Sequence, residues 1–178
     1  MLQFPVFAGI KRFSELVDSP MHGFNFCCGT ASEGLENPAT ELCPIVEHFG
    51  KRKQLFNIHF RNIKGGLHDM QEVWPDEGDV NMFQLAQTLH SVGYPYMVMP
   101  DHAPSHPDQN VDGQAGKGSQ FAFQFGYIIA IIQAIKMASM AGAPTILNGA
   151  DGWKKTRTTT ATDSYHVPKP GKGYQANL

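Results

Sequence analysis

The chain has 178 residues, 42% of them hydrophobic and 17% charged, which is typical of a globular protein and excludes a disordered one. A formal net charge of −2 supplies no general field for nucleic acid, so we expect no nucleic-acid partner. Three cysteines without a C-x-x-C pair, together with eight methionines, favour a reducing cytoplasm over an oxidising exterior. The N-terminus does not show a basic stretch followed by an apolar core, so we expect no signal peptide.

Helical and strand patterns alternate in the first third of the chain. Apolar residues at helical spacing predict a helix over 10–17. A short apolar run at 24–27 predicts a strand. A second helix is expected from Pro38, with Asn37 as its cap and Gly50 as its end, because proline fits the first helical position and glycine the last.

The same alternation continues to residue 141. A strand is expected at 55–60, followed by a long charged loop at 62–78 whose length points to function or flexibility. Asp79 is placed to cap a third helix. A third strand is expected at 96–99, and a long last helix at about 119–141.

The last helix contains the most apolar window of the chain, 121–141. Gln124, Gln133 and Lys136 interrupt this window, and Gly126 lies inside it. We therefore interpret it as a buried helix and expect no membrane partner.

The order of elements predicts an α/β fold with parallel strands and right-handed crossovers. Three strands do not close a barrel, and a complete (β/α)₈ barrel takes about 250 residues. We therefore expect residues 1–148 to form a partial (β/α)₈ TIM barrel, equivalent to the C-terminal part of a complete one. Residues 149–178 are basic, contain Thr, Pro and Gly without apolar periodicity, and are expected to be a disordered tail.

Three residues with metal-binding side chains lie near the ends of the three predicted strands: Cys27, His59 and Asp101. The residues at the C-terminal ends of parallel strands gather at one common mouth, so these side chains can converge on one divalent metal. Buried hydrophobic cysteines, a satisfied core histidine and a turn aspartate are the alternatives. The donors alone suit Zn²⁺ equally well.

Four further side chains are candidates for the chemistry around such a metal. Arg61 shares a strand face with His59, and its planar fork suits a carboxylate. His102 comes directly after Asp101, and histidine as a residue type suits proton transfer because an unperturbed imidazole has a pKa near working pH. Glu72 has no evident structural task, and Lys117, flanked by glycines at a helix start, can bind an anion.

The segments DSPMHGFNFCCGT, IHFRNIKGG, QEV with DEGDVNM, VGYPYMVMPDHAP and GYIIAIIQAI, in this order, resemble mannonate dehydratase over about residues 13–135. That family is a lyase of hexuronate breakdown with a xylose-isomerase-like barrel, and the likeness covers its C-terminal half. The resemblance implies Mn²⁺ or Fe²⁺ bound by Cys, two His and Asp. Cys27, His59 and Asp101 would take three of these places, and the second His has no counterpart here.

The resemblance further implies a cytoplasmic enzyme of glucuronate catabolism that dehydrates D-mannonate to 2-dehydro-3-deoxy-D-gluconate. Asp101, His102 and Arg61 would be catalytic, while Arg61, Glu72 and Lys117 would bind substrate. We expect the chain to form a homo-oligomer or to need the missing N-terminal half of the barrel. The stretch GKGSQFAFQFG departs from the family pattern.

Two other functions remain open from the sequence. One is a metal-dependent sugar isomerase or epimerase of the same fold, because a fold does not fix chemistry. The other is an inactive or oligomerising barrel fragment that serves as a binding module. A metal-dependent nuclease is disfavoured by the charge balance.

Overall fold

The computed structural model describes residues 5–102, 104 and 116–140, all within the first of two units, Met1–Ile146. The tail expected at 149–178 lies outside the described residues. The elements in chain order are α1 (Pro5–Ser14), β1 (Phe24–Cys27), α2 (Cys28–Glu33), α3 (Pro38–Lys51), β2 (Leu55–His59), β3 (Ile63–Lys64), β4 (Gln71–Glu72), α4 (Met82–Ser91), β5 (Met97–Met99) and α5 (Gly116–Met140).

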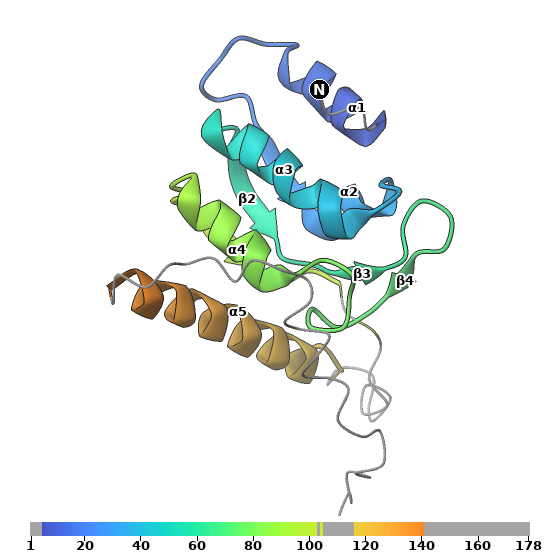
Figure 1. The fold of residues 1–178 in the computed structure, drawn as a ribbon, viewed down its shortest axis with the longest axis vertical. Coiled ribbons are helices and arrows are strands. Elements are labelled where there is room, and N and C mark those ends of the chain that lie inside the picture. Colours follow the sequence, from blue (N-terminus) through green and yellow to red (C-terminus); the bar gives the residue numbers. More distant parts are fainter. Residues whose placement is uncertain (1–4, 103, 105–115, 141–178) are drawn as a thin grey trace, which may run out of the picture. The chain divides into compact units, whose positions relative to one another are not determined.

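The main sheet has three strands in the order β1-β2-β5, and both neighbouring pairs are parallel. The connection from β1 to β2 runs through α2 and α3, and the connection from β2 to β5 runs through α4. Helices α3, α4 and α5 lie in succession along one side of the fold (Figure 1). The α/β class with parallel strands is confirmed, and both outer strands, β1 and β5, are edges of the described sheet.

One face of the sheet carries the hydrophobic core. Phe26 of β1 pairs in register with Ile58 of β2, and both are buried against the helices. Alternate strand residues point to opposite faces, so the neighbouring pair, Cys27 and His59, belongs to the other face. The buried apolar residues that α3 and α4 contribute include Leu42, Ile45, Val46, Phe49, Met82, Leu85, Ala86 and Leu89.

Helix α3 begins where the sequence predicts, with Asn37 as its cap and Pro38 at its first position. The Asn37 side chain makes no capping bond, and its backbone N–H donates to the carboxylate of Glu41 instead. The sequence predicted that Gly50 ends this helix, but the helix continues to Lys51 and Gly50 lies inside it. A Cβ there would be 2.5 Å from Cγ2 of Val92, so this glycine allows α3 and the end of α4 to approach closely.

The start of α4 also corrects the sequence analysis. Asn81, rather than Asp79, caps this helix, because the Asn81 side chain accepts a hydrogen bond from the backbone N–H of Gln84. Asp79 instead accepts from the N–H of Gly65 at 2.7 Å. The long loop therefore folds back on itself, and β3 pairs antiparallel with β4 inside it.

A buried asparagine, Asn62, holds this loop together. Its Nδ2 donates to the carbonyls of Pro75 and Val80 at 2.8 and 2.9 Å. Its Oδ1 accepts from the N–H groups of Ile63 and Val80 at 3.0 and 3.2 Å. Because Asn62 is only 2% exposed, these bonds replace water for the amide and for the backbone groups that it contacts.

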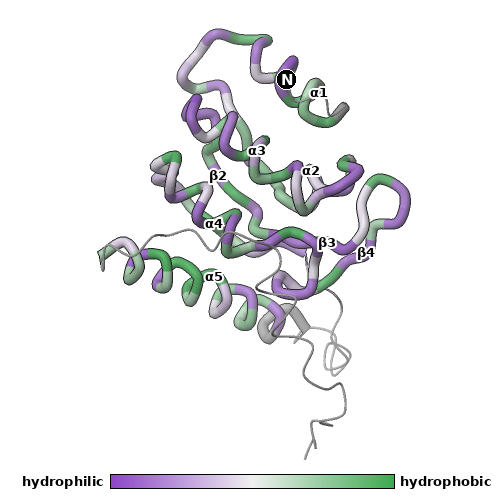
Figure 2. Tube along the Cα trace, viewed as in Figure 1, coloured by the Kyte–Doolittle hydropathy of each residue, from purple (hydrophilic) through white to green (hydrophobic). Residues whose placement is uncertain are grey.

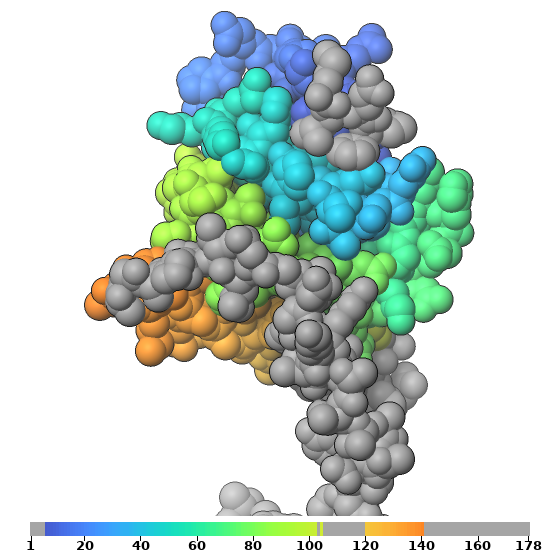
Figure 3. Space-filling view, in the orientation of Figure 1, coloured from blue at the N-terminus to red at the C-terminus, as the bar shows by residue number. Residues whose placement is uncertain are grey.

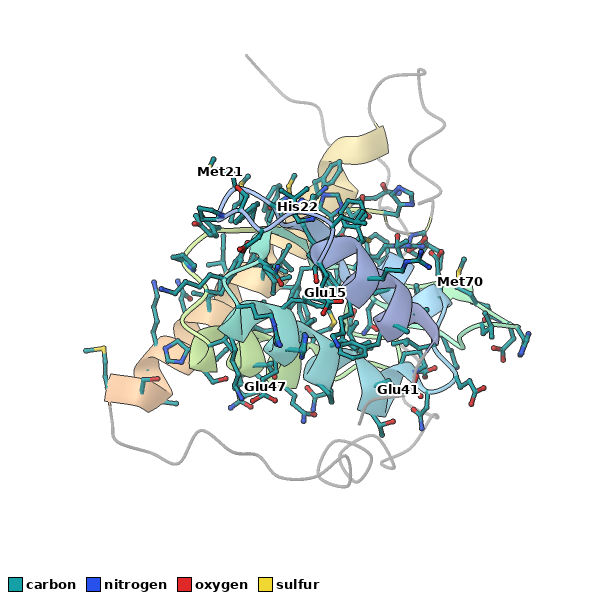
Figure 4. The ribbon with its side chains drawn as sticks, turned by 90° about the horizontal axis from the view of Figure 1, so that it is seen from above. Glu15, Met21, His22, Glu41, Glu47 and Met70 are labelled. Atoms are coloured by element: carbon teal, nitrogen blue, oxygen red, sulfur yellow. The ribbon has the colours of Figure 1, made fainter. Side chains whose placement is uncertain are left out.

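Figure 4 shows how the loop lies relative to the rest of the described fold. Met70, at the end of the β3–β4 hairpin, lies on one side, away from Glu41 and Glu47 of α3. Met21 and His22, in the segment before β1, lie on another side.

The first helix, α1, ends at Ser14, whereas the sequence predicted that it continues to residue 17.

The sequence predicted a buried helix at this position, but the last helix, α5, is buried along one stripe only. The stripe consists of Gln120, Gln124, Ile128, Ile131 and Ile135. Its segment Gln120–Met140 is long and apolar enough to cross a membrane by length and composition, and 22% of its apolar window is buried in the structure. Green and white predominate along α5, whereas purple recurs along α3 (Figure 2).

We expect Asn62→Ala to lower the free energy of unfolding by at least about 2 kcal/mol, because each buried polar group left unpaired costs about 1–3 kcal/mol. Urea unfolding followed by circular dichroism measures this. Asn37→Ala is the control: the Asn37 side chain is exposed and makes no capping bond, so a change within about 0.5 kcal/mol is expected. Equal losses in both variants would contradict the role given to Asn62.

Candidate metal centre

Three donor side chains from the three parallel strands meet on the face of the sheet that the helices leave open. Cys27 and His59 are direct register partners at the C-terminal ends of β1 and β2. His59 in turn pairs with Met99, two residues before Asp101. The ligand atoms of Cys27, His59 and Asp101 all lie within 4.8 Å of one another.

The distances within this triad fit a shared cation. Cys27 Sγ lies 3.3 Å from Asp101 Oδ2, and His59 Nδ1 lies 3.4 Å from the same oxygen. Ligand bonds of about 2.0–2.3 Å place tetrahedral donors about 3.3–3.8 Å apart. The side chains of His59 and Asp101 are 22% and 20% exposed, so the triad is shielded yet reachable. The residues present therefore fit a divalent metal with positions left for further ligands.

The change from strand to helix at residue 28 decides which of the two adjacent cysteines joins the triad. Cys27 ends β1 and caps α2, and its sulfur accepts from the N–H of Thr30 at 3.4 Å. Cys28 begins the helix and is fully buried, and burial raises the pKa of its thiol. One cysteine thus faces the open side of the sheet and the other belongs to the core.

Arg61 is buried beside the triad, and two carboxylates engage its guanidinium. Its Nη2 and Nε donate to Glu72 at 2.6 and 3.0 Å, and its Nη1 donates to Glu33 at 2.6 Å. Arg61 is only 4% exposed, and the bonds to Glu72 are the main cause that raises its pKa above the usual value. This network joins the end of β2 to α2 and to the β3–β4 hairpin.

A glycine leaves the space that the Arg61 side chain occupies. A Cβ on Gly29 would lie 2.6 Å from both Cγ and Cδ of Arg61. Gly29 is in the first turn of α2, directly after the two cysteines. In the sequence CCG, Cys27 therefore belongs to the triad and Cys28 belongs to the core. Gly29 leaves the space that the Arg61 side chain fills.

His102 is 70% exposed and stands at the edge of the triad. Its Nε2 lies 3.7 Å from Oδ1 of Asp101, and its Nδ1 lies 4.0 Å from Oε2 of Glu72. Glu72 therefore lies between Arg61 and His102. Pro104 is tied to α5, because the Gln120 side chain donates to its carbonyl at 2.7 Å.

The structure brings together six of the seven residues that the sequence singled out, and Lys117 is the exception. Lys117 lies in the first turn of α5, and its side chain is outside the described residues. Sequence reasoning missed Glu33 and Gly29. Their spacing from Arg61 along the chain gives no local signal, because only the packing of α2 against β2 brings them to the guanidinium.

The family model of D-mannonate dehydratase (UxuA) matches residues 6–141 of the chain. Mannonate dehydratase of Enterococcus faecalis is 36% identical over 98 residues, which cover 53% of this chain and 26% of that protein. Mannonate dehydratase 2 of Halalkalibacterium halodurans is 34% identical over 98 residues, covering 53% of this chain and 28% of that protein. The aligned part of the chain thus spans about a quarter of the length of these curated relatives.

A solved structure, the mannonate dehydratase from Streptococcus suis serotype 2, matches this fold with a TM-score of 0.61. The match covers 77% of this chain and 38% of that chain at 21% sequence identity. At this identity the likeness concerns the fold. The matched helices and strands thus correspond to part of the fold of that solved chain.

Gly29→Ala should destabilise the chain by about 1–3 kcal/mol, because the new methyl group meets a buried side chain that two carboxylates hold in place. Gly126→Ala is the matched control, since a Cβ at that helical position meets nothing within 4 Å. The control should be neutral or up to about 1 kcal/mol more stable. Thermal unfolding of both variants checks the contrast, and an unaffected Gly29→Ala would contradict the close fit.

Co²⁺ titration of the purified chain should produce a thiolate-to-cobalt absorption band. Cys27→Ala should abolish the band and weaken metal binding by at least about tenfold, because it removes a ligand. Cys43→Ala is the control, as this cysteine lies on α3 and packs against the core. Equal loss of the band in both variants would contradict the assignment of Cys27.

Proposed function

The chain belongs to the D-mannonate dehydratase family, and from this premise we propose that it acts in the metal-dependent dehydration of D-mannonate to 2-dehydro-3-deoxy-D-gluconate. The supporting observation is that Cys27, His59 and Asp101 approach one another on the open face of a parallel sheet. The reaction would serve glucuronate catabolism in the cytoplasm.

Cys27, His59 and Asp101 would hold Mn²⁺ or Fe²⁺. Such an ion, when bound, supplies a positive charge that stabilises the anion left when a proton leaves the carbon beside the substrate carboxylate. A thiolate, a neutral imidazole and a carboxylate together also carry enough negative charge to compensate a divalent cation. The fourth protein ligand that the family uses would come from a strand beside β1.

His102 is the residue that we assign to proton transfer. Dehydration removes a proton from C2 and returns one to the hydroxyl that leaves C3, so the site needs a group that both accepts and donates protons. His102 has an exposed ring at the edge of the triad, within reach of a bound sugar acid. Asp101 would serve as a ligand and would also help to orient this ring.

Arg61 and Glu72 would act mainly as a pair. Because Glu72 and Glu33 engage the Arg61 guanidinium, its contribution to catalysis would be to hold the Glu72 carboxylate beside His102. A direct contact of Arg61 or Glu72 with the substrate stays a prediction. A role of Lys117 in substrate binding stays a prediction.

The described sheet would be part of a (β/α)₈ barrel, in which strands beside β1 and β5 close the ring. This follows from the parallel order of strands with helices on one face, and from the relatives' greater length. The remaining strands would correspond to the part of the relatives' length that the matched region does not cover. The site would then be enclosed on all sides.

Incubation with Mn²⁺ and D-mannonate tests the proposal, with detection of the 2-keto-3-deoxy product. The assay uses the full chain alone and the chain co-expressed with the N-terminal half of the S. suis enzyme. We expect the product in at least the second preparation. A ketose formed from an aldose would indicate an isomerase instead, and no turnover in either preparation would refute the proposal.

In the active preparation, His102→Ala should lower kcat by about 10²–10⁴-fold, because it removes a proton-transfer group, while the bound Mn²⁺ content stays unchanged. Elemental analysis beside steady-state kinetics separates these effects. His68→Ala, an exposed histidine at the tip of the hairpin, is the control and should leave both values unchanged. Loss of metal together with rate in His102→Ala would make His102 a ligand instead.

A further inference from the structure

Helix α1 is held to the rest of the fold by a small number of apolar side chains. Phe7 is the buried apolar residue that its described part contributes to the core, and Val6 and Ile10 pack against the core from half-buried positions. Figure 3 shows α1 in blue at one end of the molecule, next to α3 in cyan. An element that docks through so few side chains can open locally while the remaining fold stays intact.

A histidine of α3 provides much of the surface on which Phe7 rests. The ring of His48 lies against the rings of Phe7 and Phe49, with centroid distances of 4.9 and 5.0 Å and interplanar angles of 87° and 82°. Its Nε2 is buried and, within the described residues, has no hydrogen-bond partner. Such an apolar contact tolerates a neutral imidazole and disfavours a charged one, because a buried charge needs a partner.

Arg52 fixes the protonation state of this ring. Its Nη1 lies 3.1 Å from Nδ1 of His48, and it also donates to the backbone carbonyl of His48 at 3.4 Å. Because an arginine side chain can only donate, Nδ1 must accept, and the ring proton is therefore on Nε2. A second proton would have to bind at Nδ1. It would break the bond with Arg52 and leave an imidazolium in contact with a guanidinium.

The charged groups that face this ring are Arg52 of α3 and Lys11 and Glu15 of α1. Burial, Arg52 and Lys11 lower the pKa of His48 below its usual value of 6.5, and Glu15 acts in the opposite direction. Glu15 also forms an ion pair with Lys11 at 3.5 Å, so its charge is shared. An attraction of the charged ring to Phe7 would offset part of the cost of protonation, but two neighbouring cations oppose it.

We propose that His48 is a pH-sensitive switch for helix α1: the neutral ring keeps α1 docked on α3, and protonation at Nδ1 releases α1 while the rest of the fold stays intact. Because the pKa of His48 is lowered in the docked state, this state binds fewer protons than the released state. Docking is therefore complete well above pH 6.5 and weakens as the pH falls below that value. The switch requires neither a metal nor the proposed function.

Another histidine, His22, also contacts α1, but its protonation acts in the opposite direction. Its Nε2 lies 2.9 Å from the backbone carbonyl oxygen of Phe13. The nitrogen must donate in this bond, and a protonated ring keeps and strengthens it. Acidification therefore cannot release α1 through His22, which makes this residue a matched control.

Hydrogen–deuterium exchange followed by mass spectrometry tests the proposal on the full chain, at about pH 7.5 and about pH 5.5, on either side of the ordinary histidine pKa. The protection of the α1 amides, corrected for the intrinsic exchange rate at each pH, is compared with that of α3 and α4. His48→Phe keeps an aromatic ring that does not titrate. Arg52→Met keeps the histidine and removes the cation beside it. His22→Gln is the control.

We expect the protection of α1 to fall at least about threefold between the higher and the lower pH in the unmodified chain and in His22→Gln. The protection of α3 and α4 should stay constant. His48→Phe should protect α1 equally at both pH values. Arg52→Met should reduce the fall, because protonation of His48 then places no guanidinium against the imidazolium.

Equal protection of α1 at both pH values in the unmodified chain would overturn the proposal. A parallel loss of protection in α1, α3 and α4 would overturn it too, since that pattern indicates acid unfolding of the whole fold. A fall that persists in His48→Phe would assign the pH dependence to another group. If His48→Phe leaves α1 unprotected at both pH values, Arg52→Met decides: a reduced fall supports the switch, and an unchanged fall refutes it.

Discussion

The parallel register of β1, β2 and β5 is the constraint that places the candidate site. Pairing Cys27 with His59, and His59 with Met99, puts three strand ends at one level. The two-residue period of a strand then puts Cys27 and His59 on the face away from the helices, while Phe26 and Ile58 enter the core. A shift of one residue in either pair would send a metal-binding side chain into the hydrophobic layer.

Arg61 supports this arrangement through its ion pairs. One buried guanidinium links α2, the end of β2 and the β3–β4 hairpin through Glu33 and Glu72. A buried cation needs such partners, and each carboxylate is in turn fixed in place. The two ion pairs of Arg61 thereby hold together three separate stretches of chain at the rim of the triad. Gly29 is required in the same place because nothing larger leaves room for the arginine.

The polar loop after β2 shows a second way of fixing the rim. Asn62 holds four backbone groups of the loop, and Asp79 closes it at Gly65. A long segment without a core of its own is thus ordered by hydrogen bonds around one buried amide. Helix α5, in contrast, carries more apolar surface than α4 and β5 cover, so large apolar side chains of this helix remain exposed in the described fold.

Local sequence pattern was sufficient to predict the α/β class, the parallel strands, the starts of α3 and α5 to within a few residues, and the positions of Cys27, His59 and Asp101 near strand ends. These features depend on the spacing of apolar residues and on Pro, Gly and Asn at the ends of elements, and such signals act over a few residues. The same pattern misplaced the cap of α4, the role of Gly50 and the burial of α5, because each depends on a neighbour distant in the chain. The packing of the folded chain was needed to show that Arg61 faces Glu33 and Glu72 and that Gly29 leaves the space for its side chain. The physical reason is that side-chain partners and burial are set by which elements pack together, and local pattern does not encode that packing.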